Sequence, residues 1–154
     1  MVEASDTRYA TPRLRRAVAQ LLALETSGAP ATAETLAAAA GRLLDTLCQR
    51  LADVIGPAGV QSILQRAVKL GKSEFAFLDE RIVPGESRDS LAEPLRAALQ
   101  AHEPDVIRKV SVTLVATFLG LLANVIGDRL TWSLLQQSWP DTLLPRTDRQ
   151  ETEE

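Results

Sequence analysis

Residues 110–127 read VSVTLVATFLGLLANVIG, and no charged side chain occurs in this stretch between Lys109 and Asp128. A helix that is apolar on nearly every side must be covered all round, either by other helices or by lipid. Pro104 is typical of a first helical position and Gly127 of a helix end. We therefore predict that a helix over about 104–126 forms the apolar centre of the fold.

The composition of the chain predicts a single all-α domain. The 154 residues are 45% hydrophobic, 24% charged and only 4% aromatic, a balance typical of one globular domain. Ala and Leu dominate, and these residues favour helix over sheet. The net charge of -3 gives no general attraction to nucleic acid, so we expect no nucleic-acid partner.

Helical spacing of apolar residues predicts about six helices. Thr11-Pro12 and Thr32 are helix-start signals, and Gly56-Pro57 marks a break between two helices. The apolar stripe of the second helix is expected to continue through Val54 and Ile55. The predicted helices span about 12–25, 33–55, 58–70, 91–102, 104–126 and 129–138.

Three segments lie outside or between the predicted helices. Residues 1–10 are expected to form a flexible N-terminus and residues 141–154 a polar, disordered tail, which leaves a helical bundle domain over 11–140. Residues 72–89 lose helical periodicity and are expected to form a strap across the bundle. The strap contains a candidate lid or plug, because it is too apolar for a free linker at Phe75, Phe77 and Leu78.

The sequence contains an internal repeat at a shift of 71 residues. TLCQRLADVIGPAGVQSILQRA at 46–67 aligns without a gap with TFLGLLANVIGDRLTWSLLQQS at 117–138, with nine identities in 22 positions. The clearest shared feature is Leu-Ala, then Asp or Asn, then Val-Ile-Gly. This repeat predicts two short–long–short three-helix units, over about 12–71 and 90–139, packed around the central helix with approximate two-fold symmetry.

Residues that could carry chemistry are scarce. His102 is the only histidine and Cys48 the only cysteine, so the sequence offers no His pair for a metal and no convincing Cys–His nucleophile. Cys48 is expected to be a small buried residue beside Leu47 and Leu51. We predict no catalytic residues, no metal site and no cofactor, and hence a protein that is not an enzyme.

Two other groups of residues are candidate binding surfaces. One is an aromatic face of the last helix, which is either a partner surface or part of the core and comprises Trp132, Leu135 and Trp139. The other is a basic patch in the first helix, which is either a site for an acidic partner or an ordinary solvated face and comprises Arg13, Arg15 and Arg16.

These patterns favour a cytoplasmic protein-interaction or regulatory module whose partner is another protein or a second copy of the chain. The cytoplasmic location is expected because residues 1–16 have the charges but not the apolar core of a secretory signal. A second hypothesis is membrane action, since an apolar central helix wrapped by amphipathic helices resembles the Bcl-2 and pore-forming colicin architecture. A third is a sensor that binds an apolar small ligand between helices.

Overall fold

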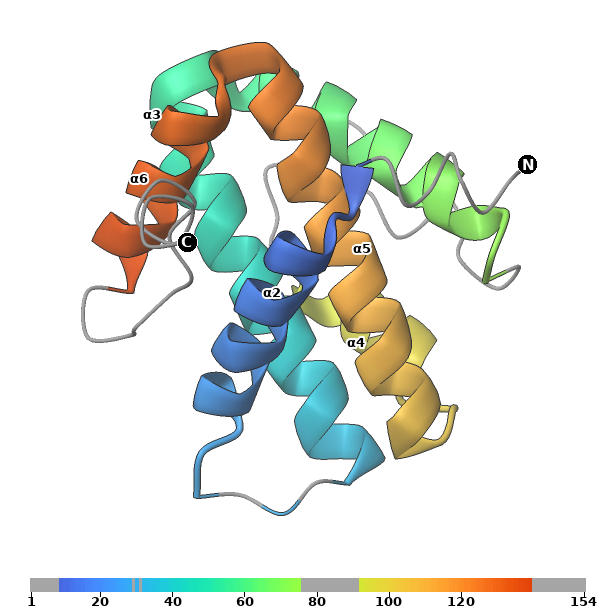
Figure 1. The fold of residues 1–154 in the computed structure, drawn as a ribbon. Coiled ribbons are helices and arrows are strands. Elements are labelled where there is room, and N and C mark those ends of the chain that lie inside the picture. The colour runs from blue at the N-terminus through green and yellow to red at the C-terminus, as the bar shows by residue number, and fades with distance from the viewer. Residues whose placement is uncertain (1–8, 29, 31, 76–91, 140–154) are drawn as a thin grey trace.

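The computed structural model describes residues 9–28, 30, 32–75 and 92–139, and this part of the chain contains helices and no strand (Figure 1). The all-α prediction is therefore confirmed. The described helices number five rather than about six, because the two helices predicted over 33–55 and 58–70 form one bent element. The helices are α2 (Pro12–Glu25), α3 (Ala33–Lys72), α4 (Ala92–Leu99), α5 (Pro104–Ile126) and α6 (Asp128–Ser138).

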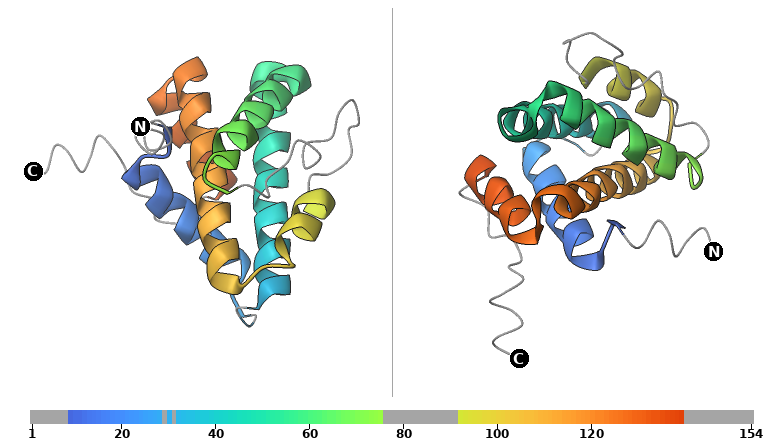
Figure 2. Two further views of the ribbon diagram at one scale, coloured as in Figure 1. Left: turned by 90° about the vertical axis from the view of Figure 1, so that its right-hand side faces the viewer. Right: turned by 90° about the horizontal axis from the view of Figure 1, so that it is seen from above.

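Helix α5 lies at the centre of the described fold. Every residue from Thr113 to Leu122 is buried, so the helix has no exposed face over this stretch. Figure 2 shows α5 between α2 on one side and α3 on the other, and α6 folds back against α5 as well. Each fully buried Leu or Phe contributes about 1.5–3 kcal/mol to the free energy of unfolding. Burial of this one helix therefore requires α2, α3 and α6 to pack around it.

Helix α3 bends at a glycine corner, Gly56, and helix α5 ends in a similar one, Gly127. Gly56 has φ 84° and ψ 155°, and Gly127 has φ 96° and ψ 153°, a conformation that residues with a Cβ avoid. Both corners lie at the same end of the molecule, at the top of Figure 1, and the segments that follow descend on opposite sides. Val54, beside the first corner, is 44% exposed and does not continue the buried stripe of α3 as predicted.

The helix starts follow the predicted cap residues. The Thr11 hydroxyl accepts a hydrogen bond from the Leu14 N–H at 3.3 Å, and Pro12 occupies the first turn of α2. At the start of α3 the Thr32 hydroxyl accepts from the Thr35 N–H at 3.2 Å while the Thr35 hydroxyl accepts from the Thr32 N–H at 3.0 Å. These reciprocal bonds satisfy backbone donors that the helix itself leaves unpaired.

A side-chain contact joins the end of α2 to α3. The Arg42 Nε–H donates to the Glu25 carboxylate at 3.1 Å, and an Arg42 terminal N–H donates to the Glu25 carbonyl oxygen at 3.0 Å. The guanidinium therefore neutralises a carboxylate and satisfies a carbonyl at the C-terminal end of α2. This contact holds α2 against α3 across the connection between them.

We expect Gly56→Ala and Gly127→Ala each to lower the free energy of unfolding by about 1–3 kcal/mol, because an alanine at these φ and ψ values is strained. Urea unfolding followed by circular dichroism would measure the change. Gly59→Ala is the control, since Gly59 is helical and a Cβ there meets only the Ile55 side chain, at 3.3 Å. If Gly56→Ala and Gly127→Ala cost no more than the control, the corners do not depend on glycine.

Candidate binding groove at the end of α5

Two hollows meet at the C-terminal end of α5. The first has a volume of about 420 Å³ and lies between the start of α2, the end of α5 and the start of α6. The second has a volume of about 640 Å³ and lies between α5 and the last turns of α3. Tyr9 and Asn124 line both hollows, so the two form one surface, which we call the Tyr9 groove. Its charged lining residues are Arg13, Arg16, Arg66, Lys69 and Asp128, and its second aromatic residue is Trp132.

The main chain of Tyr9 rests directly on α5 at Gly120. A Cβ built on Gly120 would lie 2.6 Å from the Tyr9 carbonyl carbon and closer still to its oxygen, so only glycine permits this approach. The adjacent Ala10 is fully buried. The segment expected to be flexible thus includes Tyr9, which contacts α5, and the buried Ala10, while residues 1–8 lie outside the described part of the chain.

Arg15 holds this N-terminal segment in place. Its Nε–H donates to the Ala10 carbonyl oxygen at 2.9 Å, and a terminal N–H donates to the Thr113 hydroxyl of α5 at 3.1 Å. Thr113 is buried, so the guanidinium also satisfies a hydroxyl in the core. Arg15 is therefore a structural residue here, whereas the sequence grouped it with Arg13 and Arg16 as one basic patch.

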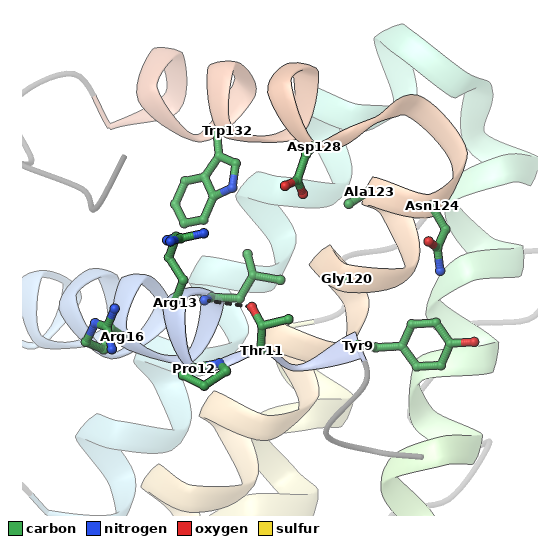
Figure 3. A pocket seen from close by; sticks show the side chains of 11 residues that line it. Tyr9, Thr11, Pro12, Arg13, Arg16, Gly120, Ala123, Asn124, Asp128 and Trp132 are labelled. Carbon is green, nitrogen blue, oxygen red and sulfur yellow. Dashed lines mark hydrogen bonds between the residues drawn. The ribbon is translucent and has the colours of Figure 1, made fainter. Parts of the chain in front are cut away.

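Arg13 and Arg16 lie at the groove. Figure 3 shows the Arg13 guanidinium just below the Trp132 ring, with Asp128 near the top of the view and Tyr9 below Asn124 at the right. The two arginines therefore give the first hollow a cationic wall next to an aromatic one.

The groove as a whole is cationic. Arg13 and Arg16 line the first hollow and Arg66 and Lys69 line the second, whereas Asp128 is the one carboxylate among the lining residues. The whole chain carries a net charge of -3. The groove thus concentrates positive charge on a protein that is acidic overall, which favours contact with a negatively charged partner.

The aromatic face predicted on α6 is mostly buried. Leu135 is fully buried and Trp139 is only 8% exposed, so both belong to the core and neither is available as a partner surface. Their spacing does place them on one face, but α6 turns that face towards α3 and α5. Trp132 lies at the edge of the face, is partly exposed and lines the groove. Leu135 and Trp139 thus follow the core alternative, and Trp132 alone stays a candidate partner contact.

The candidate lid or plug is only partly described. Phe75 is partly buried and packs against the core just after α3 ends. Phe77 and Leu78 lie outside the described residues, so the role predicted for the three together stays a prediction.

Two observations concern the titratable side chains in the part of the chain that the structure describes. No group of three or more His, Cys, Asp and Glu side chains comes together there as a metal site would need. Burial, with a smaller effect of the Asp45 carboxylate, raises the pKa of the Cys48 thiol from 9.0 to about 12. The thiol is therefore protonated at neutral pH and is a poor nucleophile.

One described helix, α5, is long and apolar enough to cross a membrane. Its most apolar 18-residue window has a mean hydropathy of 1.8, and 67% of that window is buried inside the protein. Core helices of soluble proteins share these properties, so the burial of α5 by its neighbours accounts for its composition.

Sequence reasoning missed Tyr9, Asn124, Arg66 and Lys69 as members of one site. They come from three separate segments that only the packing around α5 brings together. One signal was present, because Gly120 stands in the apolar helix where the aligned position of the repeat is Gln49. A glycine inside a well-formed helix often marks the close approach of another backbone.

Comparisons of the chain with protein-family models, with curated proteins and with solved structures found no match. The functional argument therefore depends on the residues of the groove themselves.

We expect Gly120→Ala to displace the segment 9–11 from α5, because a methyl group cannot share the space of the Tyr9 carbonyl. Overpacking of this kind costs about 1–3 kcal/mol of unfolding free energy. The measurement is urea unfolding, together with hydrogen exchange of the Thr11 N–H, which donates to the Tyr9 carbonyl at 3.0 Å. Unchanged stability and unchanged exchange in Gly120→Ala would contradict the close contact.

We expect Cys48 to react with iodoacetamide at pH 8 about 1,000-fold more slowly in the folded protein than in urea, because its pKa of about 12 leaves far less thiolate than a pKa of 9.0.

The raised pKa of Cys48 also predicts how the stability of the protein depends on pH. Between pH 9.0 and 12 the folded thiol keeps a proton that the unfolded thiol loses, so its stabilising effect is complete below this range and is lost across it. Wild type should therefore lose more stability than Cys48→Ala over this range, and parallel curves would contradict the shift.

Proposed function

We propose that the protein is a non-enzymatic interaction or regulatory module that binds another protein, or a second copy of itself, through the Tyr9 groove. The observation that carries this proposal is the composition of the groove. It contains the only tyrosine of the chain, one of its two tryptophans and three arginines. Tyr, Trp and Arg are the residues that most often dominate binding energy at protein interfaces.

Exposed apolar residues next to the groove support the proposal. Val125 lines the second hollow and is 63% exposed, and Leu130 at the start of α6 is also exposed. A large exposed apolar side chain beside charged and aromatic ones is the usual pattern of a contact surface. Burial of Val125 by a partner would remove this surface from water.

We also propose that the fold arose from two copies of a three-helix unit. The sequence repeat and the similar backbone angles at Gly56 and Gly127 support this origin. In this proposal the first unit is α2 with the two arms of α3, and the second is α4, α5 and α6. Val54 and Val125 are then equivalent positions, but only Val125 lines the groove.

The two other functions predicted from the sequence have less support. Membrane action would require α5 to leave the helices that bury it. A sensor for an apolar ligand would require an apolar cavity, whereas both hollows carry cationic and amide side chains. The interaction proposal needs no rearrangement of the described helices.

The experiment compares Val125→Glu with its repeat-equivalent control Val54→Glu. Both valines are exposed and each lies two residues before a corner glycine, so the two variants have the same charge and similar strain. We expect a partner captured from an extract of the native host to bind Val125→Glu at least about tenfold more weakly than wild type, since the substitution leaves a charge in the contact. Light scattering of each purified variant tests self-association in the same way.

The control defines the result that would overturn the proposal. Binding by Val54→Glu should stay within about twofold of wild type, and both variants should keep the helical content and melting temperature of wild type. The binding surface lies elsewhere if Val125→Glu binds the captured partner as well as wild type does. The same conclusion follows if Val125→Glu and Val54→Glu weaken binding equally.

A further inference from the structure

We infer that the Tyr9 groove binds an acidic segment of a partner protein, in which carboxylates flank an apolar side chain. This inference rests on the proposed function and adds the chemistry of the partner. It starts from the charged residues on the two sides of α5. Arg13 and Arg16 are spaced at i and i+3 on α2, and Arg66 and Lys69 have the same spacing on α3, so each hollow has its own pair of cations.

Three of these cations are available for an external carboxylate. Among the described residues, Arg16, Arg66 and Lys69 are exposed and form no ion pair. Surface arginines elsewhere do form such pairs, as Arg42 does with Glu25 and Arg108 with Asp105. Arg16, Arg66 and Lys69 thus have no described carboxylate in an ion pair with them, in contrast to Arg42 and Arg108.

The apolar part of the partner is indicated by the second hollow. Its lining includes Leu121 and Ile63, which are buried or partly buried, and the exposed Val125. An apolar side chain placed between the two cation pairs would cover Val125 and contact these two residues. The groove therefore fits a segment with an apolar anchor in its middle and carboxylates towards its ends.

The arrangement favours a chain-like ligand over a small anion. The two cation pairs lie on opposite sides of α5, since α2 and the last turns of α3 flank this helix on either side (Figure 2). A helix with its side chains is about 10 Å across, so a ligand that contacts both pairs must extend at least that far. A peptide segment has this reach, and the overall charge of -3 disfavours nucleic acid.

The test uses fluorescence anisotropy with a labelled 15-residue peptide in which Glu flanks a central Leu cluster. We expect binding at low ionic strength that weakens as salt is added, because the contact is between charges. The double variant Arg66→Glu/Lys69→Glu should raise the Kd at least tenfold. The matched control is Arg50→Glu/Lys72→Glu, which reverses the same residue types at exposed positions of α3 outside the groove and should change the Kd less than twofold.

Several results would overturn the inference. The inference fails if the peptide shows no anisotropy change at about millimolar protein, or if both double variants weaken peptide binding equally. It also fails if the peptide still binds when Lys replaces each of its Glu residues, or if a single-stranded oligonucleotide binds more tightly than the peptide. Tighter peptide binding after removal of residues 140–154 would assign the groove to the acidic tail of the chain itself and would also overturn it. If Val125→Glu weakens capture of the partner but Arg66→Glu/Lys69→Glu does not, the proposed function stands and this inference fails. If neither variant weakens capture, the proposed function and this inference both fail.

Discussion

The structure depends on the burial of a helix that has no polar face. Helix α5 is covered from Thr113 to Leu122 on all sides, so α2, α3 and α6 must be placed around it. The polar side chains within this stretch, Thr113 and Thr117, are buried. Thr113 receives a hydrogen bond from Arg15, which also binds the Ala10 carbonyl, so the burial of one hydroxyl is coupled to the placement of the N-terminal segment.

Gly120 shapes the groove that we propose as the binding site. Because it has no side chain, the backbone at Tyr9 approaches α5 directly, and Tyr9 becomes part of the wall of both hollows. The corner at Gly127 then sends α6 back along α5 and brings Trp132 to the edge of the first hollow. Two glycines with different roles thus shape the groove: one admits a close approach and the other permits a sharp turn.

The groove combines features that are separate elsewhere on the molecule. Cations from α2 and α3, the Trp132 and Tyr9 rings and the exposed Val125 converge on the end of α5. On a protein with an overall negative charge, such convergence favours a partner whose charge is complementary to the groove and not to the protein as a whole. This argument supports a role in protein interaction.

The sequence by itself determined the all-α class, the central helix, the threonine caps and the glycine corners, because these follow from local propensity and from the period of the apolar residues. It could not decide which face of α6 meets solvent, since the spacing of Leu135 and Trp139 is the same for a core face and for a partner face. It also could not separate Arg15 from Arg13 and Arg16, or bring Arg66 and Lys69 to Tyr9. Those relations depend on how distant segments pack around α5, and only the tertiary structure decided them.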